Sequence, residues 1–487
     1  MTVMVMGMAT LSLTLEGLHL TKRVQQNTLA FNLAESGAER AMRWLKDQAT
    51  PPSGTATLDP FNGAQALAGG SYAVTLIPDP NNSGAVLKAY TINASGTYGA
   101  RTESVRLLAR QQSFGKYAYF TDREISAASG GRIWFYSGDR IRGPAHSNNA
   151  SGSDFQIDWS TSTGPIFQDM VTAVSSNIDY SPSDPATEAE FSKVYKAGSR
   201  GFHLGVDPIA LPNSSDAQKN AAWGSSSGFP STTGVYVNAG GGIYVHGNAG
   251  IVMSTDGAGN QVFTVTQGST VTKVTVDLGA NEIRKQVGSG AVVTTTGVGT
   301  QVLFCSGNIS SLSGTIANNK VNSASQTIEA RSAYTIATDV NNGKNITVTD
   351  NIKYATAPDV SKPYNDPANL SSGTLGLIAR NVTVASGSPT ALEVDGIILT
   401  GSSTTSDGSF SVADYNSKTP TGRLKVVGGI IQKARGPVGT LSGGTIATGY
   451  TKDYWYDGRL ADSPPPFFPT TGLYDRISWQ RLAIGQS

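Results

Sequence analysis

The first 46 residues constrain the fold most, because they begin without charge and end as an amphipathic helix. Residues 1–15 carry no charged side chain and are rich in Met, Val and Leu. Between Gln25 and Lys46, apolar residues recur at steps of three and four, which is the spacing of one helical face. Pro51 and Pro52 close the helix, since proline cannot continue it. The sequence therefore predicts one long helix within residues 1–50.

Most apolar residues of the amphipathic part are small, so the backbone of a neighbouring helix could approach closely there. An apolar start followed by such a face favours anchoring and then side-by-side packing of helices. The uncharged stretch is shorter than the roughly 17–25 residues that a membrane span usually needs.

Three strands are expected after the helix, in residues 51–112. Gly70–Ile77, Leu87–Ala94 and Thr102–Ala109 are apolar–polar stretches separated by turn residues. Three strands beside a long helix predict a small antiparallel sheet packed on that helix.

A much larger β-rich region follows. Residues 113–233 mix aromatic strands with loops, and residues 234–448 hold short strands closed by Gly, Asn or Asp. Short strands that each end at a turn residue favour a solenoid, in which each coil contacts only its neighbours. The predicted fold class is therefore α+β, with the helix and small sheet followed by a large mainly-β domain, a right-handed parallel β-helix. An antiparallel sandwich is the competing prediction. Residues 449–487, rich in aromatics and proline, are expected to cap the solenoid, with a carbohydrate-binding platform as the alternative.

Several short motifs resemble one protein family. The stretch Leu29–Ala41, with Ala34-Glu35-Ser36-Gly37 inside it, resembles the helix of type IV pilin-like proteins of the PilX class. Gly143–Asn148, the Tyr-Asp-x-Arg-Leu element at 456–460 and Pro464–Pro469 resemble further markers of that family. No basic leader precedes the apolar run in this sequence, so we expect either residues upstream of Met1 or a departure from pilin processing.

The resemblance implies a structural protein of the cell envelope. The helix would lie in the inner membrane and then join a pilus or pseudopilus, with other pilin-like subunits as partners. The β-rich body would then be displayed for adhesion to surface carbohydrate or protein. The residues expected to mediate assembly are Leu11, Leu15, Ala30, Leu33, Ala34, Gly37, Ala38 and Ala41.

Composition and motifs argue against several other functions. A net charge of +1 does not indicate the excess of positive charge that is typical of nucleic-acid-binding proteins. The single Cys305 makes a zinc cluster implausible and is expected to be buried. Four histidines lie in four different segments without metal-ligand spacing. We therefore expect no catalytic residue, no metal and no cofactor. For His146 we expect hydrogen bonding within a Gly-Pro turn rather than catalysis.

Two alternatives remain. Glu393 and Asp395 share a strand face, and Lys425 or Arg380 could pair with them. A groove with such a cluster would favour an envelope-tethered carbohydrate-active enzyme, a polysaccharide lyase or hydrolase. The other alternative is an envelope scaffold that never enters a filament.

Overall fold

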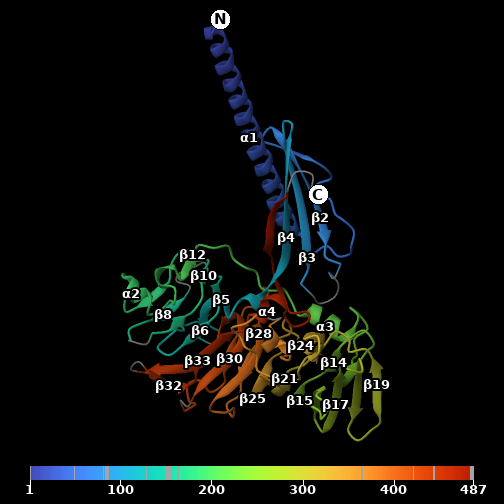
Figure 1. Ribbon diagram of the computed structural model, residues 1–487. Coiled ribbons are helices and arrows are strands. Elements are labelled where there is room, and N and C mark those ends of the chain that lie inside the picture. The colour runs from blue at the N-terminus through green and yellow to red at the C-terminus, as the bar shows by residue number, and fades with distance from the viewer. Residues whose placement is uncertain are drawn as a thin grey trace. The chain divides into compact units, whose positions relative to one another are not determined.

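The chain forms two compact units in the computed structural model (Figure 1). The N-terminal unit comprises residues 1–112 and 472–487, and the body comprises residues 113–471. The structure describes residues 2–48, 50–80, 82, 87–127, 129–149, 155–161, 164–363, 366–419, 422–442 and 445–482. The five segments expected from the sequence are distributed over these two units.

The N-terminal unit contains one long helix and a five-stranded sheet in the order β1-β2-β3-β4-β34. Its elements are α1 (Thr2–Asp47), β1 (Gln65–Leu67), β2 (Gly70–Pro78), β3 (Ala89–Tyr98), β4 (Arg101–Ser113) and β34 (Thr470–Leu482). Strands β1 to β4 pair antiparallel in chain order. Every second residue of β3 is buried, starting with Tyr90, because alternate side chains of a strand point to opposite faces. That face packs against α1.

The body contains short helices and many strands. Its first part holds η1 (Phe114–Lys116), β5 (Tyr119–Ser126), β6 (Arg140–Arg142), β7 (Ala145–Ser147), β8 (Gln156–Asp158), β9 (Ile166–Phe167), β10 (Val171–Ala173), β11 (Asp179–Ser181), α2 (Glu188–Phe191), η2 (Gly198–Arg200), β12 (Phe202–Leu204) and α3 (Asp216–Trp223). Its middle part holds β13 (Gly234–Val237), β14 (Ile243–His246), β15 (Ala249–Thr255), β16 (Gln261–Gln267), β17 (Thr270–Asp277), β18 (Glu282–Val287), β19 (Val292–Thr296), β20 (Val302–Cys305), β21 (Ile309–Ile316), β22 (Lys320–Asn322) and β23 (Thr327–Ala330). Its last part holds β24 (Ala333–Thr338), β25 (Ile346–Tyr354), η3 (Pro367–Asn369), β26 (Thr374–Ala379), β27 (Val382–Val384), β28 (Leu392–Thr400), β29 (Phe410–Val412), β30 (Arg423–Arg435), β31 (Gly439–Ser442), β32 (Thr445–Gly449), β33 (Thr451–Tyr456) and α4 (Arg459–Asp462).

Most body strands belong to one 23-stranded sheet of mixed direction. One parallel run pairs β12, β10, β7, β5, β30, β28, β26, β24, β20 and β14 in that order. Strands β28 and β30 change neighbours at Gly396 and Gly428, which lie side by side with φ of +146° and +149°. Strands β15 to β19 instead form an antiparallel meander. The apolar core of the body includes a cluster of three aromatic rings, those of Phe135, Phe155 and Phe167.

The predicted fold class, α+β with a right-handed parallel β-helix, is wrong. The chain is mainly β, α1 is the one long helix among the described residues, and the large sheet mixes parallel and antiparallel pairs. Some neighbours are also distant in sequence, since β5 pairs with β30 as well as with β7. The physical reason is that short apolar strands closed by turn residues have one sequence pattern, whatever the direction or the sequence distance of their partner.

Candidate functional site

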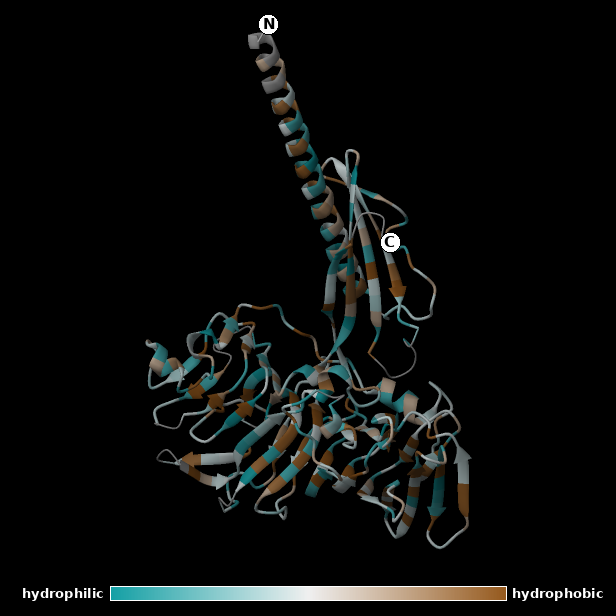
Figure 2. Ribbon diagram, in the orientation of Figure 1, coloured by the Kyte–Doolittle hydropathy of each residue, from teal (hydrophilic) through white to brown (hydrophobic). Residues whose placement is uncertain are grey.

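The first half of α1 presents large apolar side chains to solvent. Between 49% and 68% of the surface is exposed for Met6, Met8, Leu11, Leu13, Leu15, Leu18, Leu20 and Val24. This part of the helix extends beyond the sheet of the N-terminal unit (Figure 1). Figure 2 shows apolar residues recurring along it. Exposed apolar surface of this extent is typical of interaction sites. Leu11 and Leu15, both expected from the sequence, lie within it.

No helix in the described part of the chain combines the length and the apolar character needed to cross a membrane. Glu16, His19, Lys22 and Arg23 interrupt the exposed apolar residues of α1.

The second half of α1 is instead buried inside its own unit. Ala30, Leu33, Ala34, Ala38, Ala41 and Leu45 are at most 4% exposed, and Gly37 is buried with them. They pack against Tyr72, Val74, Tyr90, Ile92 and Ala94 of β2 and β3. The periodic small residues therefore face a sheet of the same chain. Six of the eight residues expected to mediate assembly lie in this internal interface, and their role in assembly stays a prediction.

Two glycines set how closely α1 approaches the sheet. A Cβ added to Gly96 of β3 would lie 2.1 Å from the carbonyl oxygen of Ala30 and 2.3 Å from the amide nitrogen of Ala34. A Cβ on Gly37 would lie 2.9 Å from the ring of Tyr72. Both distances are shorter than van der Waals contact, so the helix backbone rests directly on the sheet at Gly96.

The last strand, β34, also helps to fix α1. Trp479 packs edge-to-face on Phe31, with ring centroids 6.0 Å apart. Arg481 lies 4.9 Å over the Phe31 ring and forms an ion pair of 3.0 Å with Glu103. Arg476 pairs with Glu39 of the helix. Sequence reasoning missed these contacts, because the apolar alternation around Ile477 and Trp479 indicates a strand but not its partner.

The acidic and basic residues considered for catalysis are engaged in structural contacts. Glu393 forms ion pairs with Lys425 (2.5 Å) and Lys353 (3.0 Å). Asp395, only 3% exposed, accepts the backbone N–H of Tyr354 at 2.9 Å. A general acid must reach its substrate, which so buried a carboxyl does not. Arg380 pairs with Asp407 instead of with either residue.

His146 and Cys305 also make structural contacts. His146 lies in strand β7 and not in the expected Gly-Pro turn. The His146 ring contacts Thr172 Oγ1 at 2.8 Å and Asn148 Oδ1 at 3.0 Å, and stacks on Phe120. Burial lowers its pKa to about 4, so the ring is neutral at pH 7. The predicted burial of Cys305 is confirmed, and burial raises the pKa of its thiol to about 12, which disfavours the reactive thiolate.

Asp395 predicts a measurable pH dependence. Burial raises its pKa to about 7, although the Tyr354 N–H opposes this. Because the folded-state pKa lies above the unfolded-state value, the free energy of unfolding falls by about 1.4 kcal/mol per pH unit between about pH 4 and pH 7. We expect Asp395→Asn to remove this loss. The free energy of unfolding of the variant, relative to that of the wild type, should therefore be about 2–3 kcal/mol higher at pH 8 than at pH 5.

Chemical denaturation of both proteins at the two pH values measures this gain. Because His146 is buried in its neutral form, it makes the free energy of unfolding rise with pH below about pH 6.5. This contribution is the same in both proteins, so the difference between variant and wild type is the informative quantity. Asp350→Asn is the matched control, because Asp350 is exposed. An equal pH dependence in both variants would refute the assignment.

Comparisons with known proteins give a distant structural likeness. No protein-family model and no curated protein matches the chain. Among solved structures, the chain is similar to the crystal structure of the competence-associated pilin ComZ from Thermus thermophilus. The match covers 94% of this chain and 97% of that one, with 12% identity and a TM-score of 0.36. A likeness this distant carries no inference about residues or function.

Proposed function

We propose that this chain is a type IV pilin-like structural protein of the cell surface. The exposed apolar half of α1 packs against the equivalent helices of other pilin-like subunits in a pilus or pseudopilus. Before assembly the same half-helix associates with the inner membrane. The body is displayed outward for adhesion or interaction, and the protein is not an enzyme.

The exposed apolar residues between Met6 and Val24 are the observation that carries the proposal. Each large apolar side chain gains about 1.5–3 kcal/mol when it leaves water, so a free helix with this surface strongly favours a partner. The buried half of α1 supports the proposal because it attaches the free half firmly to the N-terminal unit. The resemblance of Leu29–Ala41 to pilin-like helices points the same way.

Replacing Leu11 and Leu15 together by serine tests the proposal. Both side chains are exposed, so folding is expected to be unchanged while helix packing loses several kcal/mol of apolar burial. We expect the protein on sheared filaments to fall at least about tenfold, as counted by immunogold labelling with an antibody to the body.

The control variant replaces Val292 and Val293 of β19 by serine, because these residues are equally exposed but belong to the body. Its filament label should match that of the wild type. Circular dichroism melting should give the same transition for all three proteins. Undiminished filament label in the Leu11 and Leu15 variant, or no label on wild-type filaments, would contradict the proposal and favour an envelope scaffold.

A further inference from the structure

The body contains a cavity that the proposed assembly of helices does not use. Its volume is about 310 Å³, which is within the range of small-molecule sites. Three parts of the chain form its walls: lining residues between Ser126 and Asp139, Tyr415 after β29, and lining residues between Pro437 and Lys452, from β31, β32 and the start of β33. All three belong to the body, so the cavity depends on one unit only.

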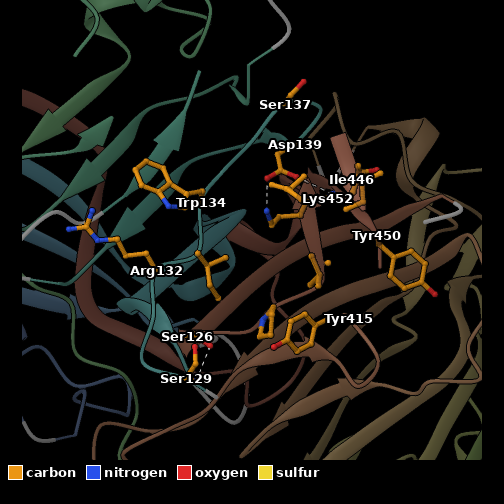
Figure 3. A pocket seen from close by; sticks show the side chains of 16 residues that line it. Ser126, Ser129, Arg132, Trp134, Ser137, Asp139, Tyr415, Ile446, Tyr450 and Lys452 are labelled. Atoms are coloured by element: carbon orange, nitrogen blue, oxygen red, sulfur yellow. Dashed lines mark hydrogen bonds and ion pairs between the residues drawn. The ribbon is translucent and has the colours of Figure 1, made fainter. Parts of the chain in front are cut away.

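Aromatic side chains form two sides of the cavity. Figure 3 shows Trp134 on one side, and Tyr415 and Tyr450 on the other. Trp134 and Tyr415 are half-buried, so part of each ring is open to a ligand. Within the described part of the chain, neither the Trp134 indole N–H nor the Tyr415 hydroxyl has a hydrogen-bond partner. Both rings therefore offer an apolar face and a free polar group.

Tyr450 differs from these two rings because its hydroxyl is already engaged. It donates to the carbonyl of Pro389 and contacts Ser388 Oγ at 3.1 Å. The ring is consequently fixed, and it supplies a rigid wall rather than a hydrogen bond to a ligand.

The remaining lining combines apolar residues, such as Ile133, Leu441 and Ile446, with polar residues whose charges nearly balance. Asp139 and Lys452 form a buried ion pair at the cavity (Figure 3). Arg132 pairs with Asp179. Both side chains are buried, and the Asp139 carboxylate also accepts the backbone N–H groups of Tyr136 and Lys452, so the pair forms a neutral part of the wall. No net charge is left to select a strongly anionic or cationic ligand.

From this arrangement we infer that the cavity binds a neutral sugar ring of a polysaccharide. A pyranose has C–H faces that pack on aromatic rings and hydroxyls that both donate and accept hydrogen bonds. The rings of Trp134 and Tyr415 match the first property, and the free indole N–H and phenol hydroxyl of the same two residues match the second. The inference concerns the body alone and holds whether or not the protein enters a filament.

Ligand-observed NMR with the full-length protein tests the inference. The probes are methyl glucoside, methyl galactoside, N-acetylglucosamine and the trisaccharides maltotriose and cellotriose, with glucuronic acid as a charged comparison. We expect saturation transfer to at least one neutral sugar, with a dissociation constant of about 1 mM, because a single ring buries little surface. Trp134→Ala should weaken binding about tenfold.

Two further variants separate the cavity from general surface effects. Trp479→Ala is the matched control, since Trp479 is 47% exposed and lies in the N-terminal unit. It should bind as the wild type does. Tyr415→Phe keeps the ring and should lose affinity less than Tyr415→Ala. Absence of transfer to any neutral sugar, equal losses in Trp134→Ala and Trp479→Ala, or stronger binding of glucuronic acid would overturn the inference.

Discussion

Arg459→Met will lower the free energy of unfolding of the body by about 3–5 kcal/mol, because it leaves a buried carboxylate without its cation. Arg459 and Asp457 are both fully buried. The guanidinium donates to both carboxylate oxygens, from Nε at 2.9 Å and from Nη2 at 2.6 Å. A third donor, Nη1, reaches the carbonyl of Ser372 at 3.0 Å. Methionine fills similar volume but provides none of these hydrogen bonds.

Chemical denaturation followed by tryptophan fluorescence measures this loss. Arg43→Met is the matched control, because it breaks an exposed ion pair with Asp47 and should cost less than about 1 kcal/mol. The double variant Asp457→Asn with Arg459→Met removes the buried charge as well, and should recover part of the stability. Equal losses of unfolding free energy in Arg459→Met and Arg43→Met would show that the buried ion pair stabilises the body no more than an exposed pair does.

Gly96→Ala will loosen α1 from its sheet, with an expected loss of about 3 kcal/mol in the N-terminal unit. The new Cβ would lie 2.1 Å from the Ala30 carbonyl oxygen, and helix backbone cannot move aside as a flexible side chain can. Hydrogen exchange of the amides of β3 and of residues 30–45 measures the effect locally, and protection should fall at both places.

Gly17→Ala is the control for that experiment, because a Cβ at Gly17 meets nothing within 4 Å. The same addition there should leave exchange in residues 30–45 unchanged, with a helix-propensity gain of at most about 1 kcal/mol. Wild-type protection in Gly96→Ala would mean that the helix does not rest on β3 as described.

The sequence by itself determined the local features. Steps of three and four predict the helix that runs from Thr2 to Asp47, and Pro51 lies just beyond its end. The apolar neighbours of Cys305 predict its burial, which is confirmed. Each of these inferences needs only residues close in sequence.

Tertiary structure decided every question of partner. Periodicity identifies the small-residue face of α1, but not whether a second helix or the chain's own β3 covers it. The strand pattern around Phe120 does not reveal that β5 pairs with the distant β30 on one side and with β7 on the other. The cavity beside Trp134 likewise draws on residues some 300 positions apart. Short-range patterns indicate which side chains are buried. The surface that covers them depends on the whole chain, because the hydrophobic effect is not directional and does not specify a partner.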